Sequence, residues 1–327
     1  MKTMLRTVTS AIAWLVVGLL PIALVHAQSY PTRPIKIIVP FAAGSGTDVV
    51  ARLTGHEMSV LLGQTVIIEN QSTGATVVAT QNVARAAPDG YTLFLTTSAH
   101  AILPSLHNDL AFDVIKDFSP VMLVCAGPLV LTSNPNFPAK NVKDLIALAK
   151  AKPGQINYAS SGTGTAPHLA MELLKVKAGI NLVHVPYRGG GPAMSDVLAG
   201  VVPLYFSAPS TALPHIKAGT ALALGQTTGT RSELIKDIPT IAEQGVPGYN
   251  MELWYALLGP ADLPRPIVDR LVTAMSAALK KDEVKQTLEK LGFAPKPSTP
   301  EELGKYIRSE VEQWSVVAKA ANLSEQK

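Results

Sequence analysis

The sequence predicts an α/β protein that folds as two domains. Strand-like and helix-like segments alternate along the chain, which is typical of α/β proteins with largely parallel sheets. The chain has 327 residues, enough for two domains with separate cores. Residues 127–250 carry their own set of strands and helices, whereas the segments on either side are each short of strands for a full sheet. We therefore expect 28–126 and 251–327 to build domain 1 together, and 127–250 to form domain 2.

Residues 1–27 have the pattern of a secretory signal peptide. Two basic residues stand near the start, an apolar run covers 11–25, and small residues precede a cleavage site after residue 27. The apolar run is shorter than the roughly 20 residues that a membrane-spanning helix needs. Cys125 is the only cysteine, so the exported chain has no internal disulfide, which favours the bacterial periplasm. We expect cleavage near residue 27 and a soluble periplasmic protein.

The elements of domain 1 follow from the apolar pattern. Strands are predicted at 35–40, 65–70, 88–98 and 119–131, and helices at 47–62 and 77–85. The first helix has four apolar residues roughly on one side and ends at Gly63. The third strand follows a Pro-Asp-Gly turn, and the fourth is apolar and β-branched, which predicts a buried strand. The segment around Pro104, flanked by His100 and His107, is interpreted as a loop.

Domain 2 and the C-terminal segment continue the alternation. Strands are predicted at 156–160, 181–187, 202–209, 221–228 and 253–260, and helices at 141–150, 167–177, 192–198, 266–281 and from 299 onward. Asn141 can cap the first of these helices, and Thr299 with Glu302 forms a capping box at the last. The chain would cross between the domains near 124–128 and near 249–254. Two such crossings make a hinge beside a cleft.

Three glycine-rich turns each leave the end of a strand and open a helix: AAGSGT, SSGTGTAPH and YRGGGPA. One such turn is explained equally well as a tight connection, but in an open α/β sheet three of them converge on a ligand crevice. The first two fail the third position of the dinucleotide fingerprint, and no stretch has the P-loop spacing. Exposed N–H groups at helix starts favour an anion, and hydroxyl side chains are dense in the first two turns. A carboxylate ligand therefore fits these turns better than a phosphate.

Other classes of function are not indicated. No Gly-x-Ser-x-Gly motif is present, and no two histidines have a metal-ligand spacing with a glutamate beside them. We expect no catalytic residue, no metal and no cofactor. The formal net charge is only +4, and the absence of a dense basic patch argues against a nucleic-acid partner. Cys125 lies in an apolar run, where a buried inert thiol is the ordinary interpretation.

Several longer motifs resemble those of one known family. YPTRPIKIIVPFAAGSGTDVVAR, APDGYTLF, YASSGTGTAPHLAMELLK, HVPYRGGGPAMSDVLAG, ALPHIKAG and IPTIAEQGVPG together resemble the Bug/TctC family of periplasmic receptors for tripartite tricarboxylate transporters. The resemblance spans nearly the whole mature chain. It implies the type II periplasmic binding protein architecture, with mixed, mostly parallel sheets flanked by helices, two crossover strands and a ligand cleft. It also implies binding of small carboxylates, membrane components of such a transporter as partners, and no catalysis. We expect a monomer.

The resemblance also implies a set of ligand-binding positions. In the family, the turn after the first strand and the Ser/Thr-Gly turn of the second domain hold the ligand carboxylate. The matching and neighbouring positions here are Phe41, Ala42, Ser45, Gly46, Thr47, Ser98, Ser160, Gly162, Thr163, Pro186, Tyr187 and Ser207. Arg188 is either a counter-ion or an outward-facing ion-pair residue, and Asp48 is interpreted as part of a helix cap.

The chain departs from the family pattern in three places. Ser45 stands where glycine is common, residues 71–76 replace a Pro-Gly-Ala-Gly-Gly stretch, and Ser207 stands where many members have Asp. Because neutral Ser207 offers no partner for an ammonium group, we expect an acid without an amino group, such as a dicarboxylate or an aromatic carboxylate. Glu172 and Asp196 are interpreted as solvated or capping. Phe41, Tyr187 and Phe206 are either walls for an aromatic ring or core residues.

Two alternatives to a transport receptor stay open at this point. The same liganded form can dock a membrane histidine kinase and act as a sensor, and an enzyme acting on a carboxylate is the third possibility. The identity of the carboxylate does not follow from the residues.

Overall fold

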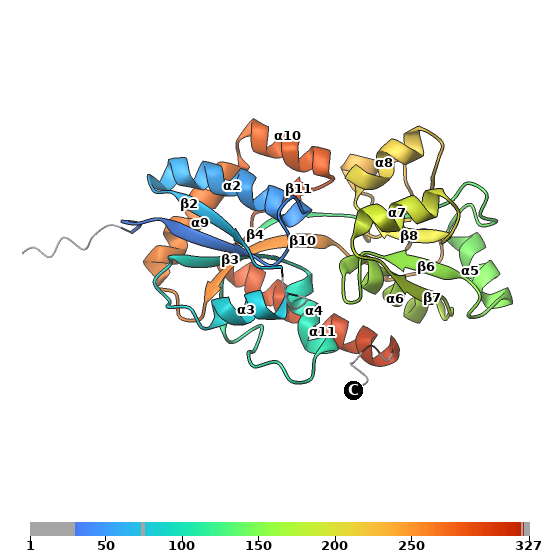
Figure 1. Ribbon diagram of the computed structural model, residues 1–327, viewed down its shortest axis with the longest axis horizontal. Helices are drawn as coiled ribbons and strands as arrows, with labels where there is room; N and C mark the ends of the chain where they lie inside the picture. The colour runs from blue at the N-terminus through green and yellow to red at the C-terminus, as the bar shows by residue number, and fades with distance from the viewer. Residues whose placement is uncertain (1–29, 73–75, 322, 324–327) are drawn as a thin grey trace, which may run out of the picture.

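The computed structural model describes residues 30–72, 76–321 and residue 323, so the predicted signal peptide lies outside the described residues. Two lobes lie side by side, each built on one sheet (Figure 1). The sheet of the first lobe has the strand order β11 (Ala294–Pro295), β4 (Phe118–Gly127), β10 (Leu253–Pro260), β3 (Thr92–Thr97), β1 (Ile35–Val39) and β2 (Val66–Asn70). The sheet of the second lobe has the order β7 (Val183–Pro186), β6 (Asn157–Ser160), β8 (Leu204–Ser207), β5 (Val130–Ser133) and β9 (Leu222–Gln226).

Both sheets are mixed, as the predicted fold class requires. β1 pairs in parallel with β2 and β3, and β6 pairs in parallel with β7 and β8. The antiparallel pairs all involve β4, β5 or β10, because β10 runs antiparallel to β3 and β4 while β5 runs antiparallel to β8 and β9. These are the strands next to the crossings between the lobes.

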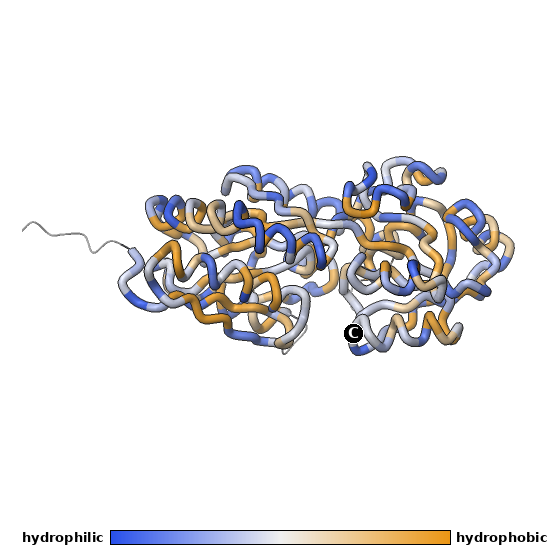
Figure 2. Tube along the Cα trace, turned by 90° about the horizontal axis from the view of Figure 1, so that it is seen from above, coloured by the Kyte–Doolittle hydropathy of each residue, from blue (hydrophilic) through white to orange (hydrophobic). Residues whose placement is uncertain are grey.

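Helices cover both faces of each sheet, as Figure 1 shows. On the first sheet, one face is covered by α2 (Gly46–Leu62), α9 (Arg265–Leu279) and α10 (Asp282–Leu291), and the other by α3 (Val77–Ala84), α4 (Ala99–Leu106) and α11 (Pro300–Ala321). On the second sheet, α7 (Gly190–Leu198) and α8 (Pro209–Lys217) cover one face, and α5 (Val142–Ala151) and α6 (Ala166–Ala178) the other. Figure 2 shows hydrophobic segments in the interior of both lobes. None of the helices within the described ranges is long and apolar enough to cross a membrane.

The first crossing corrects one predicted strand. The segment 119–131 was expected to be a single strand, but it divides into β4 and β5, which belong to different sheets. The division falls at Gly127 and Pro128, where Gly127 packs so closely on the chain that a Cβ there would lie 2.3 Å from the Gly292 carbonyl oxygen. Pro128 has no N–H for a ladder. The second crossing leads into β10, and the domain limits given by the sequence stay a prediction.

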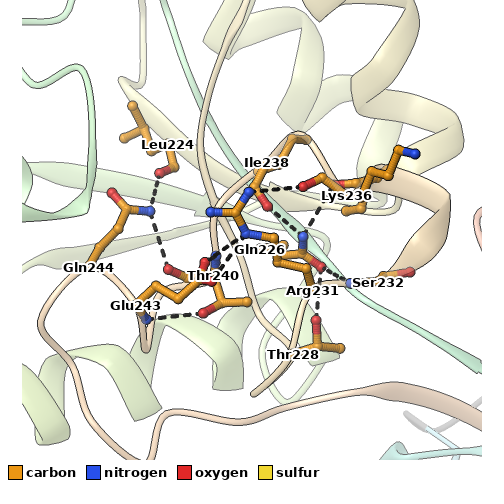
Figure 3. A network of polar contacts seen from close by, with 11 residues as sticks. Leu224, Gln226, Thr228, Arg231, Ser232, Lys236, Ile238, Thr240, Glu243 and Gln244 are labelled. Carbon is orange, nitrogen blue, oxygen red and sulfur yellow. Dashed lines mark hydrogen bonds and ion pairs between the residues drawn. The ribbon is translucent and has the colours of Figure 1, made fainter.

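A polar network fixes the segment that leads back to the first lobe (Figure 3). Gln226 is fully buried, and its side-chain amide donates to the Ile238 carbonyl at 2.6 Å while its oxygen accepts from the Ser232 N–H at 2.9 Å. Glu243 accepts from Arg231 Nε at 3.0 Å and also from the backbone of this segment. Buried amides that are fully paired in this way hold an irregular segment in one conformation.

Helix α4 was not predicted. The segment 99–106 was interpreted as a loop because Pro104 interrupts it, and a proline inside a helix removes one backbone hydrogen bond. The structure forms a short helix with Pro104 inside, packed against α11. Burial of apolar side chains on this helix outweighs the local cost of the proline. Helices α8 and α10 were also missed.

His100 is therefore a buried helical residue and not a loop residue. It is 1 % exposed, and its Nε2 lies 2.8 Å from the Val114 carbonyl oxygen. Because a carbonyl only accepts, Nε2 carries the proton and Nδ1 is the unprotonated nitrogen, which has no partner among the described residues. Burial lowers the pKa of His100 to about 4, although the Val114 hydrogen bond opposes this.

Candidate functional site

A cavity of about 540 Å³ lies between the lobes. Its volume is typical of sites for small ligands. The first lobe contributes Pro40, Phe41, Ala42, Thr47, Ser72, Thr76, Thr97, Ala99, Ile102, Leu103, Leu106, His107, Leu253 and Tyr255. The second lobe contributes Ser161, Thr163, Gly164, Thr165, Ala166 and Pro167. The starts of α2 and α6, which follow the first two glycine turns, thus both open into one cavity.

The buried carboxylate of Asp48 stabilises the first turn through hydrogen bonds. Ser45 caps α2 by accepting the Asp48 N–H at 3.3 Å. Asp48, which is 3 % exposed, accepts from the Gly44 N–H at 2.9 Å, from the Asn70 amide at 2.9 Å and from Arg52. Burial alone would raise the pKa of Asp48, but these hydrogen bonds, led by Arg52, lower it. Asp48 therefore supports the turn, in agreement with its interpretation as part of the cap.

This arrangement leaves the helix start available to an anion. Gly46 and Thr47 are the first two residues of α2, and N–H groups at these positions have no carbonyl partner within the helix. Thr47 lines the cavity. Gly46 lies against the phenol of Tyr255, since a Cβ there would be 3.2 Å from the Tyr255 hydroxyl. The positive end of the α2 dipole consequently lies at the cavity wall.

In the second turn, Ser160 is turned away from the cavity. Its hydroxyl is hydrogen-bonded to His184 Nε2 at 2.6 Å and to the Gly162 carbonyl at 3.0 Å. Ser160 is fully buried and does not line the cavity, so it is not placed to donate directly to a ligand there. Its neighbours Ser161 and Thr163 line the cavity, and Thr163 is exposed. Thr163 was among the predicted positions, whereas Ser161 lines the cavity in place of Ser160.

A buried polar cluster lies behind the second turn. His168 Nδ1 accepts the Gly164 N–H at 3.1 Å, and its ring stacks on His184 with 4.0 Å between centroids. Glu172 is 2 % exposed and accepts from Tyr158 and from Lys175 Nζ at 2.7 Å. The interpretation of Glu172 as solvated was therefore wrong, because strand β6 brings the Tyr158 hydroxyl to it. Burial lowers the pKa of His168 to about 3 and that of His184 to about 4.

The remaining predicted positions do not line the cavity. Ser98 and Ser207 are buried with hydroxyls that have no partner among the described residues. Tyr187 donates to Asp196 Oδ2 at 2.6 Å, and Pro186 is exposed. Burial and Asp196 together raise the pKa of Tyr187 to about 12.

Several other residues are placed by the fold in positions that the sequence left open. Phe206 is a core residue, whereas Phe41 belongs to the cavity wall. Arg188 is exposed. Cys125 is fully buried, and burial raises the pKa of its thiol, as expected for an inert cysteine.

The cavity residues missing from the predicted set come mainly from α4 and from the second turn with the start of α6, and β10 adds Leu253 and Tyr255. Because Pro104 favours a loop over 99–106, the sequence interpretation gives this segment no apolar face. A periodic signal was present, because Ala99, Ile102, Leu103 and Leu106 have the spacing of one helix face. Within the described residues, no group of three or more histidine, cysteine, aspartate or glutamate side chains could hold a metal ion.

Gly164 has a steric role in the site. Its φ is +76°, and a Cβ there would lie 2.6 Å from Leu106 Cδ1 in the other lobe. Gly164→Ala is expected to destabilise the protein by about 1–2 kcal/mol from the left-handed backbone alone and to push α4 from the turn. Gly179→Ala is the matched control, because Gly179 has φ +61° and no atom near its Cβ position. Urea unfolding of both variants should show a larger loss for Gly164→Ala, and equal losses would mean that the contact with Leu106 relaxes freely.

Comparison with known proteins identifies the family to which this chain belongs. The family model described as "Tripartite tricarboxylate transporter family receptor" (TctC) matches residues 50–323. The chain belongs to the TctC family. Protein BugT of Bordetella pertussis is 34 % identical over 297 residues, which is 90 % of this chain and 91 % of BugT. A UPF0065 protein from the TAR-I ttuE-ttuC' intergenic region of Agrobacterium vitis is 35 % identical over 90 % of this chain and 86 % of its own length.

Solved structures of TctC-type proteins share the fold of this TctC protein. The periplasmic binding protein BugD has a TM-score of 0.78 at 33 % identity, covering 91 % of this chain and 100 % of BugD. A Rhodopseudomonas palustris protein solved with adipate has a TM-score of 0.80 at 33 % identity, covering 90 % and 99 %. MatC from the same organism, solved with bound malate, has a TM-score of 0.76 at 32 % identity, covering 88 % and 100 %. The predicted fold class is confirmed, and this TctC protein is a solute-binding protein of the type found in the periplasm.

Proposed function

We propose that this protein captures a small carboxylate in the periplasm and delivers it to the membrane components of a tripartite tricarboxylate-type transporter, without catalysis. The observation that carries the proposal is the meeting of two helix starts, those of α2 and α6, at one cavity lined with hydroxyl side chains. N–H groups at helix starts and hydroxyl donors are the groups that bind a carboxylate. The adipate and malate bound in two relatives support this chemistry.

The site positions follow from the same proposal. One carboxylate oxygen is held by the amides of Gly46 and Thr47 in the first lobe, and the other by Ser161 and Thr163 in the second. Because the ligand then bridges two lobes joined by two crossings, binding draws the lobes together. The signal peptide at 1–27, the domain limits and the monomeric state belong to the proposal as well.

A thermal-shift screen of the exported protein against carboxylic acids tests the proposal. An acid present at 100 times its dissociation constant should stabilise the protein by about 2.7 kcal/mol. Amino acids, sugars and phosphate esters are the negative panel. If one of these compounds and no simple carboxylate stabilises the protein, the proposed ligand class is wrong. Uptake measured in a deletion strain then separates transport from sensing, since a sensor would leave uptake intact and abolish gene induction.

Thr163→Ala is expected to weaken binding of the best acid from the screen by about tenfold to hundredfold. The hydroxyl of an exposed threonine on the cavity wall would be lost, and a charge-assisted hydrogen bond contributes roughly 1.5–3 kcal/mol. Thr273→Ala, on the outer helix α9, is the control and should bind normally. Isothermal titration calorimetry measures both. An unchanged affinity in Thr163→Ala would show that the Thr163 hydroxyl does not hold the carboxylate.

A further inference from the structure

Thr76 directly precedes α3 and lines the cavity from the first lobe. It is 9 % exposed, and its hydroxyl has no hydrogen-bond partner among the described residues. No other described lining residue has a buried hydroxyl that lacks a partner. Such a hydroxyl is unfavourable in the folded protein, because it has lost water and gained no hydrogen bond in return. A ligand in the cavity can supply the missing partner.

The backbone of Thr76 is strained as well. Its φ is +75°, in the left-handed region, where a side chain with a branched Cβ is a rare outlier. Asp262, the other described non-glycine residue with positive φ, is of a type that tolerates this region better. Two unfavourable features thus meet in one residue at the cavity wall. Residues in strained conformations of this kind cluster at ligand-binding sites.

The start of α3 is open to a ligand atom. Thr76 occupies the N-cap position, but its side chain makes no capping hydrogen bond. The first N–H groups of α3 therefore have neither an intrahelical partner nor a side-chain cap, and together with the helix dipole they favour an oxygen atom. The start of α6, where the proposed function puts one carboxylate oxygen, likewise has no side-chain cap.

We propose that Thr76 is a specificity-determining residue whose hydroxyl binds an oxygen atom of the ligand other than those of the carboxylate held by the two glycine turns. This ligand oxygen takes the capping position at α3 and is the partner that the hydroxyl lacks. The proposal rests on the proposed function and deepens it, because the ligand becomes an acid with a second oxygen-bearing group, either a hydroxyl or a carboxylate. The strained backbone is retained because it holds the hydroxyl at the cavity.

Two matched series of acids test the proposal on the unmodified exported protein. Butyrate, 4-hydroxybutyrate and succinate form the shorter series, and hexanoate, 6-hydroxyhexanoate and adipate form the longer one. Within each series the far end of the chain is a methyl, a hydroxyl or a carboxylate group. Calorimetry at pH 7.5 should show, in at least one series, that an oxygen-ended acid binds about fivefold or more tightly than the methyl-ended acid.

Thr76→Val removes the hydroxyl and keeps the branched shape. The preference for the oxygen-ended acid should fall by about fivefold or more, while the methyl-ended acid should bind within about twofold of its normal affinity. The urea midpoint of the ligand-free variant should not fall, because the hydroxyl has no partner to lose. Thr76→Ser keeps a hydroxyl and should keep the preference.

Thr54→Val is the matched control. Thr54 is also a buried threonine, but its hydroxyl donates to the Val50 carbonyl at 2.8 Å and does not line the cavity. This variant should keep the full preference for the oxygen-ended acid and lower the urea midpoint. If Thr76→Val does not fold, Thr76→Gly takes its place, because glycine removes the hydroxyl and adopts a positive φ without strain.

The outcomes separate this proposal from the proposed function. If the methyl-ended acids bind as tightly as the oxygen-ended acids, or if Thr76→Val keeps the preference, the role of Thr76 is overturned while the proposed function stands. A lower urea midpoint in Thr76→Val with unchanged binding would overturn it too, because the hydroxyl would then serve the fold through an ordered water. If neither the six acids nor benzoate binds, the proposed function itself fails and this proposal fails with it.

Discussion

When the pH falls from 7 to 5, the His100→Phe variant is expected to lose about 2 kcal/mol less unfolding free energy than the native protein. His100 is buried between aromatic rings, with its ring centroid 4.8 Å from that of Phe118. Its pKa is lowered to about 4 in the folded state, against about 6.5 when unfolded. The unfolded chain therefore binds more protons below pH 6.5, and folding loses about 1.4 kcal/mol per pH unit until the folded pKa is reached. Stability from this group is present above pH 6.5 and lost as the pH falls toward 4.

Urea unfolding at pH 7 and pH 5 gives the loss of unfolding free energy for each protein, and the effect is the difference between the two losses. The native protein should lose about 2 kcal/mol more than His100→Phe over this interval. Phe keeps the aromatic packing but cannot take up a proton, so any loss of the Val114 hydrogen bond affects both pH values equally. His56→Asn is the matched control, because His56 is exposed, and this variant should keep the full acid dependence. An identical pH dependence in His100→Phe would show that the imidazole is protonated within the fold.

Glu310→Ala is expected to cost about 2–5 kcal/mol of unfolding free energy. Glu310 Oε2 accepts from the indole N–H of Trp254 at 3.0 Å and from that of Trp314 at 3.2 Å. Both tryptophans are fully buried, so removal of the carboxylate leaves two buried donors without a partner. Each unsatisfied donor costs about 1–3 kcal/mol. Trp254 lies at the start of β10, directly after the return crossing, so this contact also anchors the crossing to α11.

Glu310→Gln separates the acceptor from the charge. The glutamine keeps an oxygen in place, and it has no charge for burial to penalise, which is the effect that raises the pKa of Glu310. We expect a loss well below that of Glu310→Ala, measured by urea unfolding at pH 7. A loss under about 0.5 kcal/mol in Glu310→Ala would contradict the prediction and indicate that water satisfies both indoles.

Features of the fold that depend on local chemistry were predictable from the sequence. The glycine turn before α2, the part of Asp48 in the cap of that helix and the Asn141 cap follow from residues within four positions of each other, and each is found as expected. Alternation of strands and helices gave the two-sheet architecture. Local patterns are informative here because capping and positive φ act over single turns of chain.

Features that depend on distant partners were not predictable. Ser160 was expected to face the ligand, but His184 on the neighbouring strand takes its hydroxyl. The loop interpretation of α4 was wrong because the helix packs against α11, which lies about two hundred residues later in the chain. This packing stabilises the helix despite Pro104. Ser207 was expected on the cleft side, yet β5 and β8 bury it. Ser207 therefore gives no support to the expected preference against ammonium groups.

The position of β10 has a consequence for the order in which the chain folds. β10 lies between β3 and β4, so the first sheet stays split into two parts until residues 253–260 join it. Pairing Leu253 with Gly127 closes a very long loop, whose entropic cost is large for an unstructured chain. If 127–250 folds first, its two ends already lie next to each other, so the pairing of Leu253 with Gly127 no longer requires closure of a long unstructured loop. The second lobe can thus act as the template on which the first is completed. In a chain made from its N-terminus, β3 and β4 stay without their shared partner until residues 253–260, almost four-fifths of the way along the chain, have been added.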